Sequence, residues 1–380
     1  MTRTHRHEAG SASSHLGTIC LVGLIAGGHS GIPRYAAMLV NAMDAVSPSF
    51  PDLRIRFLTN EAGIAATPLN TIEPVVLRMG GRFARQGPAR LLLEHVAAGT
   101  AKADVLHFFD TAGPVLAPRR PFVTTIHDAA ALRGYRRRKS IYKRRLYRWS
   151  LQHASAAIAV SESAKSDVAQ ALDADPTRIT VVHSGPGRTT DVPARDVARE
   201  RMVLYVGNVG ANKNLPLLIR AFHLTETDAR LVIAGRPSDG FRAVRTAIGE
   251  GPRRDQIELR TNVSDDEVEH LYRTAAALVL PSSYEGFGFT PLEAMARGCP
   301  VIESDIPALR EISGDGALLV APDDEKGWSH AIRRVLDEPE LQAELRARGA
   351  QTVNRFSWER TARDVLEILR AVSRHSRSDR

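Results

Sequence analysis

The chain has 380 residues, which is long for one compact domain and suits two domains of ordinary size. Hydrophobic residues make up 43% of it and charged residues 25%, values typical of a globular protein that argue against a fibrous, mostly disordered or membrane-embedded chain. The formal net charge is +8, but the segment 133–148 holds nine bases and no acid, and the rest of the chain has 42 bases and 43 acids. The excess charge is therefore one patch, which indicates one anionic partner surface.

Cysteine content and the first apolar run indicate the compartment. Only Cys20 and Cys299 occur, so we expect no disulfide framework and a reducing compartment, with the cytosol as the default. The run from Ile19 to Ala26 is much shorter than the roughly 20 residues that span a bilayer. Two arginines before it keep a signal peptide as the weaker alternative. We predict a buried first strand behind a disordered tail over residues 1–17.

Short apolar runs alternate with amphipathic stretches along the chain, which predicts strands and helices around parallel sheets. In the first half the predicted strands are Ile19–Ile25, Ile55–Thr59, Val75–Leu77, Val105–Phe109, Phe122–Ile126, Ala156–Val160 and Ile179–Val182. In the second half they are Met202–Val206, Leu231–Ala234, Ile257–Leu259, Ala277–Leu280, Val301–Glu303 and Leu318–Val320. Both halves are predicted to be α/β.

A linker divides the two halves. Residues 184–200 lack an apolar period and contain glycine, proline and charged residues, as exposed linkers do. We predict an N-terminal domain over residues 18–190 and a C-terminal domain over residues 191–356. A helix over residues 357–372 follows, and residues 373–380 are predicted to form a frayed tail.

The strongest local motif is PSSYEGFGFTPLEAMARGCP, residues 281–300, which follows a predicted strand. Gly286 and Gly288 allow close approach of the backbone to a ligand, and Thr290 predicts the N-cap of a helix whose free N–H groups favour an anion. Glu285 and Glu293 would repel a phosphate but accept hydrogen bonds from sugar hydroxyls, so the motif points to a sugar nucleotide. A pair of solvated acids beside a glycine turn is the alternative.

A second loop opens the latter half with the sequence YVGNVGANKN, residues 205–214. Ligands of doubly wound sheets bind beyond the carboxyl ends of the strands. Lys213 lies at such a strand-to-helix turn, where its ammonium group suits a diphosphate. A solvated lysine at a helix start is the alternative.

Two motifs in the first half lie at strand ends. The sequence GGHSGIPRY, residues 27–35, does not match the G-x-G-x-x-G pattern, and no acid follows at the required separation, so a dinucleotide cofactor is disfavoured. His127, in the sequence TTIHD, is predicted to be a polar contact or a proton carrier at a cleft. A histidine that is only hydrogen-bonded at a strand end is the alternative.

The basic segment is predicted to be a helix with an apolar stripe of Tyr135, Tyr142, Leu146 and Trp149. The bases off this stripe are Arg137, Arg144, Arg145 and Arg148. A solvated surface, an anionic membrane or lipid-linked acceptor, and nucleic acid are the alternatives for this patch. We expect no nucleic acid partner.

Taken together, the motif EGFGFTPLE with its preceding PSSY and the later MARGCPVI resembles the signature of the retaining glycosyltransferases of family 4. Further similar motifs run along nearly the whole chain: SGIPRY, TIHD, AVSESAKSDV, YVGNVGANKN, LVIAG, VSDDEVEHLYR and FSWERTA. The resemblance implies the GT-B architecture, in which two Rossmann-like doubly wound domains face each other across a cleft and the C-terminal helix crosses back to the first domain.

The resemblance also implies residue roles. Glu293 would bind the donor ribose, Glu285 the transferred sugar, and Lys213 the diphosphate as it leaves, while His127 would contact the sugar and the acceptor. The remaining implied donor-binding residues are Gly31, Asn208, Arg236, Val263, Gly286, Phe287, Gly288, Phe289 and Thr290.

Three features depart from the family pattern or from that of other transferases. Many relatives have an arginine where Asn208 lies, so the second phosphate cation would come from elsewhere, for which Arg236 is a candidate. Pro33 replaces a glycine and stiffens the first loop. Asp173 and Asp175 are similar to a metal-binding D-x-D motif but lie away from the cleft motifs, so we predict a solvated turn and no metal.

The resemblance implies an enzyme: a retaining hexosyltransferase that moves a mannose-type or glucose-type sugar from a nucleoside diphosphate donor to an acceptor hydroxyl. GDP-mannose is weakly favoured as donor, with a UDP-sugar next, and we predict no cofactor. The expected acceptor is a glycan or lipid-linked glycan in polysaccharide or lipid-linked oligosaccharide biosynthesis. We expect a cytoplasmic protein, with peripheral binding to the inner membrane face as an option. The alternatives are another GT-B enzyme, such as a sugar-nucleotide epimerase or phosphorylase, and a non-catalytic protein that binds lipid or RNA through the basic helix.

Overall fold

The computed structural model describes residues 17–24, 26, 31–77, 88–114, 118–130, 132, 137–187 and 198–378. Most of the predicted N-terminal tail, residues 27–30 of the sequence GGHSGIPRY, and residues 379 and 380 lie outside this range. The predicted domain boundary between residues 190 and 191 also lies outside it. The description that follows concerns the described residues alone.

The first half of the chain forms a seven-stranded parallel sheet in the order β3-β2-β1-β4-β5-β6-β7. Its strands are β1 Gly17–Val22, β2 Leu53–Thr59, β3 Glu73–Val76, β4 Val105–Phe108, β5 Phe122–Ile126, β6 Ala156–Ala159 and β7 Ile179–Val181. Its helices are α1 Gly31–Val46, α2 Glu61–Ala66, α3 Pro88–Thr100, α4 Arg137–His153 and α5 Glu162–Leu172.

The second half forms a six-stranded parallel sheet in the order β10-β9-β8-β11-β12-β13. Its strands are β8 Glu200–Val206, β9 Arg230–Ala234, β10 Ile257–Arg260, β11 Ala275–Leu280, β12 Val301–Ser304 and β13 Leu318–Val320. Its helices are α6 Leu215–Leu224, α7 Phe241–Gly249, α8 Asp265–Thr274, α9 Phe289–Met295, α10 Pro307–Ser313, α11 Glu325–Asp337 and α12 Pro339–Val353.

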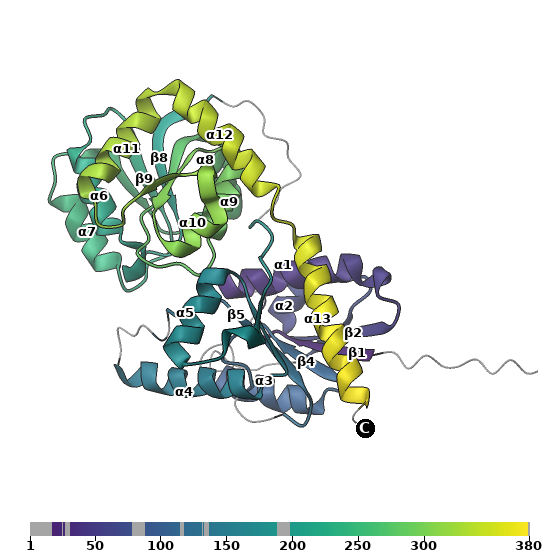
Figure 1. Cartoon of the computed structure of the whole chain (residues 1–380). Coiled ribbons are helices and arrows are strands. Elements are labelled where there is room, and N and C mark those ends of the chain that lie inside the picture. The colour runs from purple at the N-terminus through teal and green to yellow at the C-terminus, as the bar shows by residue number, and fades with distance from the viewer. Residues whose placement is uncertain are drawn as a thin grey trace, which may run out of the picture.

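Both sheets are layered between helices, and the two domains face each other (Figure 1). Strands covered on both faces consist of continuous apolar runs, as in β11, where every residue of Ala275–Leu280 is buried. In each sheet the strand order reverses beside the first strand of the domain, next to β1 and next to β8. Ligands of such sheets bind at the carboxyl ends of the strands near this reversal. The predicted α/β fold of two Rossmann-like domains is confirmed.

The last helix, α13 Trp358–Ser378, crosses from the C-terminal domain to the N-terminal domain and packs beside α1 (Figure 1). Its apolar face, with Val365, Leu366 and Leu369, is fully buried. Arg370 Nε donates to Asp52 Oδ2 at 2.9 Å, which ties the helix to the N-terminal domain. The predicted frayed tail from residue 373 is wrong, because the helix continues to Ser378, with Ser373 buried on the same face.

Two tight hydrogen bonds accompany this crossing. Trp358 Nε1 donates to the carbonyl of Pro186 at 2.5 Å, and Thr361 Oγ1 donates to the carbonyl of His183 at 2.8 Å. The segment that leaves the N-terminal domain and the segment that returns to it therefore lie against each other. Among the described helices, none has a stretch long and apolar enough to cross a membrane.

Candidate active site

One pocket of about 320 Å³ opens between the two domains at the carboxyl ends of both sheets. The N-terminal domain contributes Gly31, Arg34 and His127 to its wall. All thirteen cleft residues predicted from the sequence line this pocket: Gly31, His127, Asn208, Lys213, Arg236, Val263, Glu285, Gly286, Phe287, Gly288, Phe289, Thr290 and Glu293. The fold thus brings together motifs that are more than 250 positions apart in the sequence.

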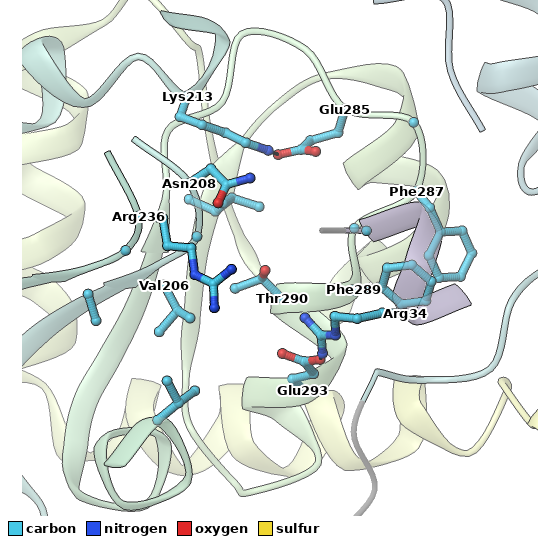
Figure 2. A pocket seen from close by; sticks show the side chains of 18 of the residues that line it. Arg34, Val206, Asn208, Lys213, Arg236, Glu285, Phe287, Phe289, Thr290 and Glu293 are labelled. Carbon is cyan, nitrogen blue, oxygen red and sulfur yellow. Dashed lines mark hydrogen bonds and ion pairs between the residues drawn. The ribbon is translucent and has the colours of Figure 1, made fainter. Parts of the chain in front are cut away.

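Lys213 and Glu285 extend from two different loops and meet at one side of the pocket (Figure 2). Lys213 Nζ donates to Glu285 Oε1 at 2.5 Å, and Ser282 Oγ donates to the same oxygen at 2.7 Å. Both charged side chains are mostly buried. An ammonium group has three N–H donors, so Lys213 keeps donors for a phosphate while it holds Glu285.

The backbones of these two loops also brace each other. The amide of Ser283 donates to the carbonyl of Asn212 at 2.9 Å, and Asn212 Nδ2 donates to the carbonyl of Tyr284 at 3.2 Å. Tyr205, at the end of β8, donates its hydroxyl to the carbonyl of Asn208 at 2.8 Å and fixes the start of its loop. Contacts within the C-terminal domain therefore place Lys213 and Glu285 relative to each other.

The helix within the motif begins two residues earlier than the sequence predicts. Gly288 occupies the N-cap of α9 with a φ of 114°, a left-handed conformation that favours glycine. Thr290, the predicted N-cap, is the second residue of the helix. The prediction was wrong because it assigned the cap by residue type, whereas the backbone turn selects the glycine. The start of α9 still lines the pocket, where the first N–H groups of a helix lack intrahelical partners.

Glu293 lies on α9 at the opposite side of the pocket from Lys213, close to Arg34 (Figure 2). Its Oε1 forms an ion pair with Arg34 of α1, across the interface between the domains. Its Oε2 accepts a hydrogen bond from the Tyr272 hydroxyl at 3.0 Å. Both oxygens of a carboxylate expected to bind ribose are thus engaged by the chain itself.

Sequence reasoning did not assign Arg34 or Tyr272 to the site. Arg34 lies in the motif SGIPRY, three residues after Gly31. Nothing in that motif indicates that Arg34 pairs with Glu293 of the other domain. Tyr272 lies on α8, whose apolar pattern predicts only a packed helix face. Spacing identifies residues of one loop, and it does not identify pairs that tertiary contact creates.

His127 follows β5 and lies at the N-terminal side of the pocket. Its Nε2 donates to the carbonyl of Phe109 at 2.7 Å, and its ring packs edge-on to Tyr35 with the centroids 4.7 Å apart. Burial lowers the pKa of His127, against the opposing effects of the Phe109 carbonyl and of the Asp110 and Asp128 charges. A neutral ring with a fixed Nε2–H directs its other nitrogen as an acceptor, which suits a contact to a hydroxyl.

A further buried acid lies behind the pocket wall. Glu303, at the end of β12, is fully buried, and neither carboxylate oxygen has a hydrogen-bond partner among the described residues. Burial raises its pKa to about 8, and the Glu285 charge adds to the shift. The raised pKa favours the protonated form of Glu303.

The basic patch lies away from the pocket, on α4. Arg144 and Arg145 are exposed, and the side chain of Arg137 lies outside the described residues. Arg148 is exposed too, but its Nε donates to the carbonyl of Leu172 at 3.0 Å, so this base also has a structural contact. The predicted apolar stripe is only partly right: Leu146 is buried, whereas Tyr142 is 52% exposed.

The two aspartates that are similar to a D-x-D motif lie at the end of α5. Asp173 ends α5 in a left-handed conformation, and Asp175 Oδ1 accepts from the amide of Thr177 at 2.9 Å. These aspartates form a turn outside the pocket. Within the described residues no group of three or more His, Cys, Asp or Glu side chains is arranged to hold a metal ion.

Two family models match the chain. The model described as Glycosyltransferase Family 4 matches residues 31–185, and the model described as Glycosyl transferases group 1 matches residues 191–352. The two matches together cover most of the chain and meet at the linker between the sheets.

Curated proteins with similar sequences include named glycosyltransferases. The O-antigen chain mannosyltransferase RfbU of Salmonella typhimurium is 31% identical over 53% of this chain and 57% of its own length. O-antigen chain mannosyltransferase B of Escherichia coli is 28% identical over 66% of this chain and 70% of its own. A D-inositol 3-phosphate glycosyltransferase of Kineococcus radiotolerans is 28% identical over 59% and 58%, respectively. The alignments with the first and third thus cover little more than half of those proteins.

Solved structures with the same fold include enzymes of the GT-B type. Sucrose-phosphate synthase of Thermosynechococcus elongatus superposes with a TM-score of 0.71 at 18% identity, covering 94% of this chain and 99% of that one. HepE of Anabaena, in complex with UDP-glucose, superposes with a TM-score of 0.71 at 15% identity, covering 94% and 100%. The fold of this chain is the same two-domain arrangement.

Proposed function

Because the chain belongs to glycosyltransferase family 4 and has the GT-B fold, we propose that it transfers a hexose from a nucleoside diphosphate sugar to an acceptor hydroxyl with retention at the anomeric carbon. The observation that supports this best is the pocket itself. It combines a lysine, a helix start and two carboxylates, the groups that a diphosphate and a sugar require. The nucleoside would lie toward Glu293 and the sugar toward Glu285.

In this proposal the main catalytic effect is stabilisation of the departing diphosphate. Lys213 and the free N–H groups at the start of α9 supply positive charge where negative charge develops. These groups are held by the loop contacts before a donor binds, so little reorganisation is needed. Thr290 and Arg236 line the same part of the pocket and would add to this charge environment.

Retention can arise from two displacements through a glycosyl-enzyme or from one attack on the face of the leaving group, and the pocket acids favour the second route. Glu285 is paired with Lys213, and Asp128 Oδ1 accepts from the amide of Ala130 at 2.8 Å within its own turn. Each of these carboxylates is thus engaged through one oxygen, which makes it less suited to act as a nucleophile. We therefore propose that the acceptor attacks from the face of the leaving diphosphate, whose oxygen takes the acceptor proton, without a glycosyl-enzyme intermediate.

The donor is proposed to be GDP-mannose first and a UDP-sugar second. Two relatives carry the name mannosyltransferase, and HepE binds UDP-glucose. The acceptor would be a glycan or a lipid-linked glycan in polysaccharide or lipid-linked oligosaccharide assembly, and the reaction would need no metal. We propose that the protein acts at the cytoplasmic side, on acceptors at the membrane surface.

Binding and product analysis test this proposal. A bound donor raises the apparent melting temperature through mass action, so a thermal-shift screen of GDP-mannose, GDP, UDP-glucose and UDP should identify one nucleotide. NMR of the product should then show the anomeric configuration of the donor, with unchanged turnover in EDTA. An inverted product would refute retention. Turnover of a sugar nucleotide without a second hydroxyl substrate would favour the epimerase alternative, and phosphate-dependent turnover the phosphorylase.

The surface of α4 supports a second proposal, that this face binds an anionic membrane. Ile141 and Tyr142 are 55% and 52% exposed, and the exposed bases Lys143, Arg144 and Arg145 follow directly. Exposed apolar residues beside bases are typical of helices that bind anionic lipid. Charge reversal of Arg144 and Arg145 should abolish co-sedimentation with phosphatidylglycerol vesicles while nucleotide binding is retained. Unchanged co-sedimentation would leave these bases as solvated surface.

A further inference from the structure

The start of α5 is a contact between the domains that lies next to the pocket. Ser161, its N-cap, accepts a hydrogen bond at Oγ from the amide of Ala164 at 2.9 Å, as helix caps do. The same hydroxyl donates to the carbonyl of Gly286 at 2.6 Å, in the other domain. The N-cap of α5 thus also holds the loop that contains Glu285. We refer to residues 281–288 as the glycine loop.

Glu311, on α10 of the C-terminal domain, binds the same end of α5. Its Oε1 accepts from the amide of Glu162 at 2.8 Å, and its Oε2 accepts from the amide of Ser163 at 2.9 Å. His183 Nε2 lies 2.7 Å from Oε1. The first N–H groups of a helix have no partner within it, and a carboxylate there is favoured by both hydrogen bonding and the helix dipole. Here the carboxylate comes from the opposite domain.

The contact keeps Glu311 ionised. Burial alone would raise the pKa of Glu311, but the bonds from His183 and from the two α5 amides outweigh burial and hold it below the usual range. Charge-assisted hydrogen bonds of this kind are stronger than neutral ones. They exist only while the two domains are together, because donors and acceptor belong to different domains.

The glycine loop packs closely against residues 127–129 of the N-terminal domain. A Cβ on Gly286 would lie 2.0 Å from the carbonyl oxygen of His127, so only glycine fits there. The Tyr284 hydroxyl accepts from the amide of Ala129 at 2.7 Å. Glu311 itself does not line the pocket. Any effect of Glu311 on the reaction is therefore exerted through the placement of this loop.

We propose that Glu311 is a positioning residue, which docks the C-terminal domain on the first turn of α5 and thereby sets the glycine loop against His127. This inference rests on the proposed function. Most of the implied donor-binding groups, Lys213 and Glu293 among them, belong to the C-terminal domain, whereas the reaction needs both domains. Loss of Glu311 should thus lower kcat more than it weakens donor binding.

The variants are chosen to break the contact from each side. Glu311→Ala removes the acceptor, and Glu311→Gln keeps one oxygen but loses the charge. Glu162→Pro removes a single donor, at the helix position that proline prefers, after a residue already in extended conformation. Glu162→Ala is its matched control, because it removes the same exposed side chain and keeps the amide N–H. Glu344→Ala, on an exposed face of α12, controls for loss of a carboxylate.

For Glu311→Ala we expect kcat to fall about 10-fold to 100-fold, with the Kd for the identified nucleotide changed less than about threefold, as misplacement of reacting groups predicts. Glu311→Gln should recover part of kcat, and Glu162→Pro should lower it while Glu162→Ala does not. The double variant Glu311→Ala with Glu162→Pro should be no slower than Glu311→Ala alone, since both remove one contact. Equal losses in kcat and nucleotide affinity, unchanged kcat, or additive losses would each overturn the proposal.

A measurement without substrate separates this proposal from the proposed function. Small-angle X-ray scattering of the nucleotide-free protein should show a larger radius of gyration for Glu311→Ala and Glu162→Pro than for wild type and the two control variants. This result is expected even if the wild-type protein transfers no sugar. An unchanged radius of gyration in folded variants, as judged by circular dichroism, would refute the docking role. If Glu311→Ala fails to fold, the radius of gyration of Glu162→Pro is compared with that of Glu162→Ala. A larger value for Glu162→Pro supports the docking role, and equal values refute it.

Discussion

The two sides of the pocket differ in how they are held. On the C-terminal side, Lys213, Glu285 and Ser282 hold each other by contacts within one domain. On the N-terminal side, Arg34 pairs with Glu293 across the interface, and His127, which its own domain holds through the Phe109 carbonyl, faces Gly286 of the other domain. The loops of the C-terminal domain are thus preorganised to bind a ligand, whereas the complete site exists only when the N-terminal domain docks on them.

The largest effect is expected from the preorganised side. Lys213→Ala should lower kcat about 100-fold to 1000-fold, because it removes an ammonium group placed to stabilise the leaving diphosphate. Initial rates at saturating donor check this. Lys326→Ala, an exposed lysine on α11 of the same domain, is the control. A rate within twofold of wild type would remove Lys213 from the catalytic assignment.

A glycine at the interface tests the docked arrangement. Gly286→Ala places a Cβ against the His127 carbonyl, a backbone atom that cannot move aside cheaply. Because the clash arises only between domains, kcat should fall about 10-fold to 100-fold. The Kd for the nucleotide should change little, because Lys213 and Glu293 of the C-terminal domain are still present. Gly249→Ala, a helical glycine with open space around it, is the control. Wild-type kinetics for Gly286→Ala would mean that the reaction occurs with this interface open.

Removal of the ion pair between Arg34 and Glu293 should have a smaller effect and should strengthen nucleotide binding. Arg34 occupies Glu293, so a ribose must displace it, and Arg34→Gln should tighten nucleotide binding about twofold to fivefold, the scale of a partly exposed ion pair. Isothermal titration calorimetry measures this. Arg310→Gln, which breaks an exposed ion pair on the same domain as Glu293, should leave affinity unchanged. Weaker binding in Arg34→Gln would show that Arg34 contacts the nucleotide instead.

The buried acid behind the pocket should affect stability more than turnover. Glu303 has a usual pKa of 4.5 when unfolded and about 8 when folded, so between these values the folded state keeps a proton that unfolding releases. The free energy of unfolding therefore falls as the pH rises, by at most about 1.4 kcal/mol per pH unit. Glu303→Gln has no such proton, so its stability advantage over wild type should widen from pH 5 to pH 8 in urea titrations. Glu344→Gln should show no such trend, and a constant difference for Glu303→Gln would mean that Glu303 is ionised in the folded protein.

Much of this arrangement could be predicted from the sequence, because it depends on local signals. Apolar runs such as β11 and loops such as the one containing Lys213 are encoded by neighbouring residues. The start of α9 was misplaced because the backbone conformation of Gly288, and not a side-chain preference, ends the loop. The end of α13 was missed because it is stabilised by Asp52, which is more than 300 positions away in the sequence.

The cross-domain pairs could not be predicted from the sequence for the same reason. Glu311 lies in an ordinary amphipathic helix and Glu162 at an ordinary helix start, and neither segment indicates the other. Glu303 was predicted only as the end of a strand, because burial of both its oxygens depends on the helices packed over that strand. The family motifs indicate the residues around the pocket, whereas the contacts that join its two sides form only in the folded chain.

The return of α13 to the first domain affects the order in which the protein can be completed during synthesis. The helix that covers β1 and α1 is made after both sheets, roughly 10 to 40 seconds after the final strand of the N-terminal domain at ordinary rates of translation. Until then the hydrophobic surface that receives Leu366 and Leu369 stays uncovered. The N-terminal domain, although first in sequence, is therefore the one that finishes folding last.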